Sequence, residues 1–346
     1  MKKALGLLIA ASMVVSLAAC GGQKTDTTAP TAGEKTEAST ENTGEVIKMK
    51  LANPNPVGDV KDLASIKFAE LVKEKTNGQV EITVYSGGQL GDSRDTIEGL
   101  GIGTNEIVIE SMGTTDAYTS LASIDAIPYL YRDYEHYQKV AFGELGAKIR
   151  DEVGEAGGFK LLGAMYRGAR VCTTKKKFTT PEELKATGLK IRVPNQQVYI
   201  DTWKLMGTNP TPLALTETFT ALQQNTVEAQ ENATIESYGF GFYDVCDYLV
   251  KTNHVYSTDV FIFNRKYFDN LPEDIQKALN EAAMEASEYR NDISREKEAE
   301  YEQMFKDKGV EVVEIDTTPF MKLFEGFVSE YYPELTDWAT EIAAVK

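Results

Sequence analysis

The sequence predicts an α/β protein whose folded body has two lobes, each built on a sheet with flanking helices. Strand-like and helix-like patterns alternate along the chain, which is typical of parallel sheets covered on both faces. About 300 residues follow a polar N-terminal segment, and a body of that length commonly divides into two lobes.

The first half of the body alternates strands with helices. Apolar residues at every second position predict strands over 47–51 and 80–84. Between them, apolar residues at helical spacing predict a helix over 59–75, which Asn77-Gly78 would terminate. The pattern continues with a short helix and a buried strand, over 91–100 and 107–109.

A second run of alternating elements begins near Tyr166. A capping box with proline at the first helical position, Thr180-Pro181-Glu182-Glu183, predicts the start of a helix. A strand over 189–193, a helix over 216–224 and a strand from residue 227 follow. The last strand leaves Asn232 at its carboxyl end, which faces the ligand crevice in open α/β sheets.

The longest helical pattern runs from Pro272 to about Lys308. At 1.5 Å per residue such a helix would measure roughly 50 Å, more than one lobe of this size needs. It is therefore either a strut that crosses both lobes or two helices separated by a break near Asn291-Asp292.

The first 45 residues resemble an export signal followed by a tether. Lys2-Lys3 precedes an apolar run that is too short to span a bilayer and ends in Leu17-Ala18-Ala19-Cys20, which is typical of a lipobox. We expect 1–19 to be a cleaved signal peptide and Cys20 to be lipidated, with an uncleaved membrane anchor as the alternative. Residues 20–45 lack large apolar side chains and predict a flexible tether. The protein is thus expected outside the cytoplasm, lipid-anchored to the outer face of the cell membrane or in the periplasm.

The composition argues against several classes of function. A net charge of −17 disfavours nucleic-acid binding, which needs a basic surface. The two histidines, His136 and His254, have no metal-ligand partners at zinc spacing, and no nucleotide-binding loop or catalytic serine motif is present. We expect no cofactor, no metal and no enzymatic activity. Cys172 and Cys246 are expected to be buried free thiols, with one disulfide as the alternative.

Arginines interrupt two strand-like patterns that are otherwise apolar or small. Arg167 and Arg170 lie within Tyr166–Val171, and Arg192 lies in Ile191-Arg192-Val193-Pro194. A buried arginine requires an anionic partner. That partner is either an internal carboxylate or a ligand carboxylate held in bidentate geometry, and both readings stay open.

At these residues the chain resembles the DctP-like solute-binding proteins of tripartite ATP-independent periplasmic (TRAP) transporters, which include receptors for sialic acid and C4-dicarboxylates. The resemblance covers nearly all of the chain after the tether. It rests on motifs in matching order: Gly88–Asp92, Ile109–Ser111, Gly188–Pro194, Asn209–Pro212, Thr220–Gln224, Gln230–Asn232, Phe242–Val245 and Thr252–His254.

The resemblance implies a two-lobed periplasmic-binding-protein clamp that closes over a small organic acid. Crossing strands and a long helix would join the lobes. The implied partners are the acid ligand and the membrane subunits of a TRAP permease, and the protein is expected to be monomeric. The implied lobes are 46–168 plus 258–297 and 169–257 plus 298–346.

The family pattern also implies the ligand-binding residues. Arg192 would pair with the ligand carboxylate, and Arg170 is the second family arginine. Asn232 would contact the ligand, and Glu110 would help to orient the arginines. Asn195 matches a further position that touches the ligand in sialic-acid receptors.

Three departures from the sialic-acid receptors bear on the substrate. Leu215 stands where they have phenylalanine, Ser93 replaces an acidic residue, and Asp259 replaces glutamine. Asp259 could accept hydrogen bonds from hydroxyls and would repel a second carboxylate. The sequence therefore favours a hydroxylated monocarboxylate such as a uronate or aldonate. The alternatives are a C4-dicarboxylate or keto acid, or a role as a sensor that feeds a signalling receptor.

Overall fold

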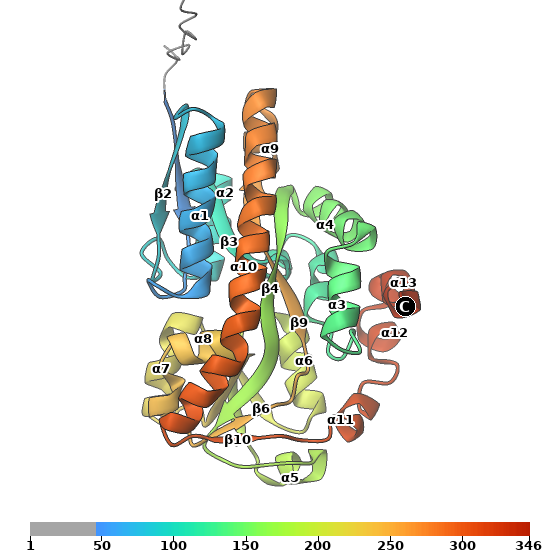
Figure 1. Ribbon diagram of the computed structural model, residues 1–346. Coiled ribbons are helices and arrows are strands. Elements are labelled where there is room, and N and C mark those ends of the chain that lie inside the picture. The colour runs from blue at the N-terminus through green and yellow to red at the C-terminus, as the bar shows by residue number, and fades with distance from the viewer. Residues whose placement is uncertain (1–45) are drawn as a thin grey trace, which may run out of the picture. The chain divides into compact units, whose positions relative to one another are not determined.

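The computed structural model describes residues 46–346, which lie within one compact unit (Figure 1). The expected signal peptide, the lipidation site at Cys20 and the tether lie outside the described residues. In the described part of the chain, no helix is both long enough and apolar enough to cross a bilayer.

Ten strands and a larger set of helices make up the described residues. The strands are Ile47–Ala52 (β1), Val80–Tyr85 (β2), Ile107–Ser111 (β3), Phe159–Thr174 (β4), Lys190–Val193 (β5), Asn209–Pro212 (β6), Ala229–Ala233 (β7), Tyr248–Val250 (β8), Tyr256–Asn264 (β9) and Glu311–Val313 (β10). The α-helices are Val60–Lys75 (α1), Ser93–Ile102 (α2), Tyr134–Ala141 (α3), Glu144–Gly157 (α4), Pro181–Ala186 (α5), Gln197–Leu205 (α6), Leu215–Gln223 (α7), Thr234–Gly239 (α8), Arg265–Asp269 (α9), Glu273–Asp307 (α10), Thr318–Lys322 (α11), Phe327–Tyr331 (α12) and Thr336–Ala344 (α13). Short 3-10 helices cover Met112–Thr115, Ser120–Ala126, Phe242–Asp244 and Pro333–Leu335.

The strands pair in the order β2-β1-β3-β9-β4-β7-β5-β6, and β8 pairs with β4 and β10. Strands β1 to β3 pair in parallel, as do β5 to β7, which the alternation of strands and helices predicts. By contrast, β9 and β4 run antiparallel to their neighbours. The sheet is therefore mixed: parallel within each part, as the alternation predicts, and antiparallel at its centre.

Strand β4 joins the two parallel parts of the sheet. Its first part pairs with β9, and its second part, from Arg170, pairs with β7 and β8. The division of lobes expected at residue 168 falls within this continuous strand. Side chains near this point belong to an element that both parts of the sheet share.

Helix α10 runs the length of the body beside β4 (Figure 1). Its 35 residues are continuous, so the strut is confirmed and the break near Asn291 is not observed. The Asn291 side chain instead accepts a hydrogen bond from the backbone N–H of Tyr166 at 2.6 Å and donates one to the carbonyl of Ala164 at 3.2 Å. Here β4 shifts its register against β9, so Asn291 satisfies backbone groups beside an irregularity in the ladder.

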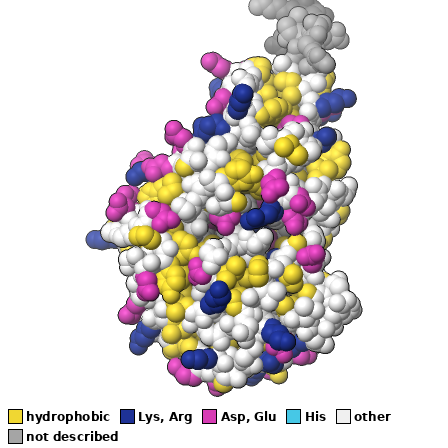
Figure 2. All heavy atoms as spheres, turned by 180° about the vertical axis from the view of Figure 1, so that it is seen from behind, with side chains coloured by type: hydrophobic (Ala, Val, Ile, Leu, Met, Phe, Trp, Pro, Cys, Tyr) yellow, Lys and Arg dark blue, Asp and Glu magenta, His cyan; other side chains and the backbone are white. Residues whose placement is uncertain are grey.

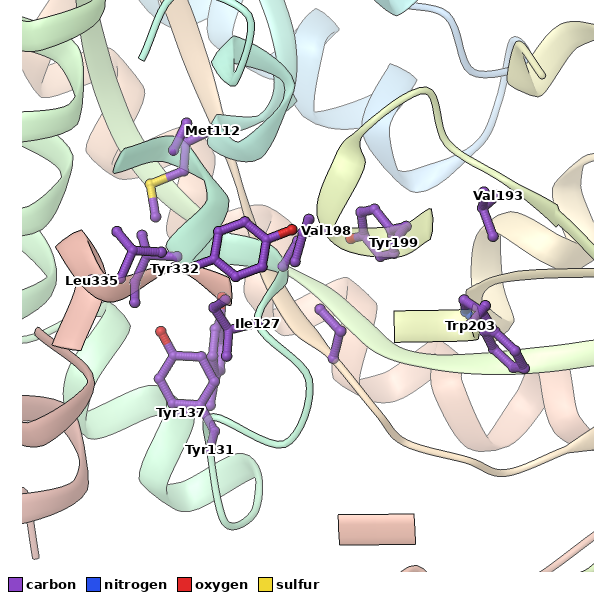
Figure 3. Close-up of a cluster of buried hydrophobic side chains, with 14 of the residues drawn as sticks. Met112, Ile127, Tyr131, Tyr137, Val193, Val198, Tyr199, Trp203, Tyr332 and Leu335 are labelled. Atoms are coloured by element: carbon purple, nitrogen blue, oxygen red, sulfur yellow. The ribbon is translucent and has the colours of Figure 1, made fainter. Parts of the chain in front are cut away.

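Two large apolar clusters cover opposite faces of the sheet. In one, Phe68 of α1 stacks on Phe261 of β9 with ring centroids 4.0 Å apart, and α10 closes the cluster with buried small residues. Figure 3 shows part of the other cluster, in which α6 meets the segment before α13. Its labelled members are Met112, Ile127, Tyr131, Tyr137, Val193, Val198, Tyr199, Trp203, Tyr332 and Leu335.

Two local predictions are confirmed. Thr180 caps α5 by accepting a hydrogen bond from the backbone N–H of Glu183 at 3.2 Å, with Pro181 at the first helical position. Cys172 and Cys246 are both buried and unbridged.

Candidate functional site

A cavity of about 360 Å³ is lined by both parallel parts of the sheet. Its walls come from the start of α2, the end of β3, the middle of β4, the loops after β5 and β6, and β7. Seven of the eight residues expected to bind ligand line it: Ser93, Glu110, Arg170, Arg192, Asn195, Leu215 and Asn232. The eighth, Asp259, is not part of its wall.

Arg192 lines this cavity as a buried cation without an acidic partner. Its side chain is 3% exposed, and Nε and Nη2 donate to the backbone carbonyl of Leu213 at 2.9 and 2.7 Å. No carboxylate of the described residues lies within ion-pair distance of it, and Nη1 has no hydrogen-bond partner among them. Burial, together with the positive charges of Arg170 and Arg167, outweighs the nearby Glu231 carboxylate and lowers the pKa of Arg192 to about 10. The guanidinium is still charged at neutral pH.

Arg170 also lines the cavity, but its charge is matched internally. Its Nε and Nη2 donate to the two carboxylate oxygens of Glu231 at 2.6 and 2.7 Å. Nε2 of His254 lies 3.1 Å from the same carboxylate, and Arg170 stacks over the Tyr199 ring at 4.8 Å. Burial would raise the pKa of Glu231, yet Arg170 and His254 outweigh it and hold that pKa at about 2.

His254, the third member of this group, is neutral. Burial lowers the pKa of His254 despite the adjacent Glu231. Because a carboxylate only accepts, Nε2 must carry the proton, and Nδ1 then accepts from the Thr252 hydroxyl 2.9 Å away. Glu231 and His254 belong to the quoted family motifs, but sequence reasoning gave neither a role.

A buried ion cluster lies next to the cavity and includes one cavity residue that sequence reasoning did not select. Arg167 of β4 lines the cavity and pairs with Glu236 at 2.8 Å. It also lies 3.7 Å from both Glu110 and Asp259. The arginine was visible in the strand pattern, but its carboxylate partners lie far away along the chain.

Two further cations complete this cluster. The Lys61 ammonium on α1 lies 3.0 Å from Glu110 and 3.5 Å from both Glu236 and Asp259. Arg290 on α10 lies 2.8 Å from Asp259. Three cations thus face three carboxylates, all nearly inaccessible to solvent, and the cluster is balanced in charge. Its ion pairs connect α1, β3, β4, α8, β9 and α10 next to the cavity.

The structure places Glu110 and Asp259 differently from their expected roles. Glu110 contacts Lys61, Arg167 and, at 2.5 Å, the Ser93 hydroxyl, but it makes no ion pair with Arg170 or Arg192. Its oxygens therefore position Arg167 and not the two predicted arginines. Asp259 is fully buried among three cations, where it has no direct path to a ligand hydroxyl.

The remaining predicted residues line the cavity with polar and apolar groups. The Asn232 side-chain oxygen accepts from Nη2 of Arg167 at 3.4 Å. The carbonyl of Asn195 accepts from Arg94 of α2 at 3.3 Å, a contact between two residues of the cavity wall. Leu215 opens α7 with an apolar side chain that is nearly buried. Among residues 46–346, no three His, Cys, Asp or Glu side chains are placed to hold a metal ion.

Comparison with known proteins identifies the family. The profile described as bacterial extracellular solute-binding protein, family 7 (DctP), matches residues 51–334. The chain belongs to this family. The resemblance to DctP-like solute-binding proteins of TRAP transporters is thereby confirmed, and the family description agrees with a location outside the cytoplasm.

This family 7 protein has relatives of known structure. A solute-binding protein of Roseobacter denitrificans is 33% identical over 75% of this chain and 78% of its own. The crystal structure of that protein with bound L-galactonate matches with a TM-score of 0.81 at 29% identity, covering 86% of this chain and 99% of that one.

Two more TRAP solute-binding structures are similar to this family 7 protein. One from Polaromonas, bound to D-erythronate, is 31% identical with a TM-score of 0.81 and covers 87% of this chain and 99% of that one. Another from Roseobacter denitrificans, with bound β-D-glucuronate, is 27% identical with a TM-score of 0.82. The match covers 86% of this chain and 100% of that one. The predicted two-lobed α/β fold class is confirmed by these neighbours.

Proposed function

We propose that this protein captures one hydroxylated monocarboxylate, of the uronate or aldonate class, and delivers it to a TRAP-type permease. Arg192 carries the proposal. It is a buried, charged guanidinium at the wall of a cavity, and no carboxylate of the described residues neutralises it. A ligand carboxylate would supply the missing counter-charge in the bidentate geometry that suits a guanidinium.

The charge balance of the cavity wall favours a single carboxylate. Arg170 is matched by Glu231, and Arg167 belongs to the balanced cluster with Lys61 and Arg290. Among the buried basic side chains of the wall, Arg192 is left over; Arg94, also on the wall, is exposed. A second ligand carboxylate would therefore find no buried cation of its own among the described residues, which is unfavourable.

The rest of the wall suits hydroxyl groups. Ser93, Asn195, Asn232 and Gln196 present hydroxyl or amide groups to the cavity, and Leu215 gives an apolar surface. Galactonate, erythronate and glucuronate, bound by the similar proteins, each carry one carboxylate on a hydroxylated carbon skeleton. These ligands support the proposed class for this chain.

The arginine alone does not account for useful affinity. A charge-assisted hydrogen bond contributes about 1.5 to 3 kcal/mol, whereas micromolar binding requires about 8 kcal/mol. Hydroxyl contacts and closure of the lobes over the ligand would contribute the rest, because exclusion of water strengthens the ion pair.

The proposed delivery of ligand to a permease rests on the family and on the proposed lipid anchor at the N-terminus. Lipidation of Cys20 after removal of residues 1–19 would hold the monomeric body near the membrane through the tether over 20–45. We propose that the closed form, with lobes 46–168 plus 258–297 and 169–257 plus 298–346, docks on the permease and releases ligand when it reopens.

A ligand screen on residues 46–346 tests the proposal. D-Glucuronate, L-galactonate, succinate, pyruvate and uncharged glucose are compared by thermal shift, followed by calorimetry. A ligand at about 100 times its Kd stabilises the folded state by about 2.7 kcal/mol. The hydroxylated monocarboxylates are expected to raise Tm while glucose does not. Binding restricted to succinate, or binding of glucose equal to that of glucuronate, would contradict the proposal.

A further inference from the structure

A second cavity, of about 430 Å³, lies on the other side of β4 from the first and shares no lining residue with it. Along β4, Arg167 and Arg170 line the first cavity, whereas Tyr166, Ala169 and Val171 line the second. Regular alternation would put Arg167 and Arg170 on opposite faces; Gly168 has a φ of +103° and the register against β9 shifts between Tyr166 and Ala169, so both arginines line the first cavity. The other residues that line the second cavity come from α3, α8, the segment after β8, β9 and the C-terminal half of α10.

Three tyrosine rings form the aromatic wall of the second cavity. The ring centroids of Tyr134 and Tyr166 are 4.6 Å apart, and those of Tyr166 and Tyr256 are 6.5 Å apart with nearly parallel planes. The Tyr134 hydroxyl is buried and has no hydrogen-bond partner among residues 46–346. A buried hydroxyl without a partner is unfavourable.

An acidic side chain without a counter-ion faces the same space. Glu298 of α10 lines the cavity, and its two carboxylate oxygens lie 3.5 and 3.4 Å from the Tyr166 hydroxyl. In the described part of the chain, no basic side chain is within ion-pair distance of it. Lys251 is already held by Glu302 at 2.8 Å and Glu314 at 2.9 Å. Burial, and the nearby charge of Glu302, raise the pKa of Glu298.

We propose that the second cavity binds an organic ammonium cation. The Glu298 carboxylate would pair with the positive charge, and the partly exposed rings of Tyr134 and Tyr256 would contact it through cation–π interactions. This site depends on neither Arg192 nor the proposed acid ligand.

Arg295, which also lines the second cavity, allows the predicted positive charge of the ligand to be tested. Its guanidinium lies over the Tyr134 ring, 5.5 Å from the centroid, and the side chain is exposed. It is positive, so it opposes an incoming cation electrostatically and competes for the same ring. Neutralising Arg295 should strengthen the binding of an ammonium ion, whereas neutralising Glu298 should weaken it.

The experiment measures binding of choline and ethanolamine to residues 46–346 by saturation-transfer NMR and calorimetry. Sodium chloride at equal ionic strength and the uncharged polyol inositol serve as control solutes. We expect choline or ethanolamine to bind with a millimolar or lower Kd, Glu298→Gln to weaken that binding by about tenfold, and Arg295→Gln to strengthen it by about twofold.

Glu296→Gln is the matched control, because Glu296 is exposed on the same helix and does not line the cavity. Its Kd should equal that of the parent protein. Thermal unfolding of each variant shows that it is folded. Acetate is measured as an anionic control. The proposal is overturned if neither ammonium compound binds, or if Glu298→Gln and Glu296→Gln have equal effects. It is also overturned if acetate binds and Arg295→Gln weakens the binding of acetate.

Discussion

Arg192 donates two hydrogen bonds to one backbone oxygen, the carbonyl of Leu213, from Nε at 2.9 Å and Nη2 at 2.7 Å. Leu213 is itself held by a hydrogen bond from its N–H to the carbonyl of Val193, the residue after Arg192. The main chain therefore fixes the plane of the guanidinium without neutralising its charge. Such an arrangement orients the cation before any carboxylate arrives.

Replacing Arg192 should remove most of the affinity for acid ligands. We expect Arg192→Ala to weaken binding by about two to three orders of magnitude, the effect of deleting one partner of a buried ion pair. Arg192→Lys should also bind weakly, because an ammonium cannot hold Leu213 and grip a carboxylate in a fork. Lys190→Ala, an exposed change on the same strand, is the control in calorimetry. A loss of less than about fivefold in Arg192→Ala would assign a structural role to the arginine.

Glu231 should make the protein sensitive to acid. Its pKa of about 2 lies below the unfolded value of 4.5, so its ionised form stabilises the folded state. The stabilisation is fully present above about pH 4.5 and is lost as the pH falls towards 2, amounting to about 3 kcal/mol. Glu231→Gln should be less stable at pH 7, because Arg170 is left buried without a counter-ion, and its stability should vary less over this window. Urea unfolding at several pH values measures both effects, and equal slopes for the two proteins would contradict the assignment.

Gly163 should tolerate no side chain. It adopts a φ of +75°, and a Cβ there would collide with the Ser287 hydroxyl and lie 3.0 Å from the Ala283 carbonyl of α10. Gly158 has a nearly equal φ of +77° but open space around it. We expect Gly158→Ala to lower the free energy of unfolding by about 1 kcal/mol, from backbone strain alone. Gly163→Ala should lower it by about 2 to 4 kcal/mol, because overpacking against α10 adds to that strain. Similar Tm values for the two variants would show that β4 and α10 can separate at this point.

Local signals in the sequence predicted much of the fold, and the exceptions have physical causes. The helix start at Thr180 and the helical spacing after Pro272 are set by neighbours along the chain, and the structure confirms both. The Glu183 side chain accepts from Thr179 and not from the N–H of Thr180, so only half of the predicted capping box forms. Strand β6, Asn209–Pro212, was not predicted, because two of its four residues are prolines. Proline cannot donate to a ladder, and β6 is an edge strand paired only with β5, where that loss is tolerated.

The candidate site was predictable only in part. Family motifs pointed to residues on the cavity wall, whereas the partners of the charged groups depend on tertiary contacts. Lys61 reads as an ordinary helix lysine until the fold brings it to Glu236, 175 positions later in the numbering, at 3.5 Å. Basic and acidic side chains are scattered over the surface as well (Figure 2), so charge alone does not mark those that are buried.

Replacing Asp259 distinguishes its predicted role as a ligand contact from its observed position in the buried ion cluster. A ligand contact would alter binding when replaced, but the structure surrounds this carboxylate with Lys61, Arg290 and Arg167. Burial opposes its ionisation, and these cations outweigh burial, so the pKa of Asp259 is lowered. Asp259→Asn would leave an excess of buried positive charge and should lower the free energy of unfolding by about 3 to 5 kcal/mol. Ser257→Ala, a buried change two residues away whose hydroxyl makes no hydrogen bond in the described residues, should cost far less. If Asp259→Asn kept the parent Tm and changed only the Kd for the acid ligand, Asp259 would be a ligand contact after all.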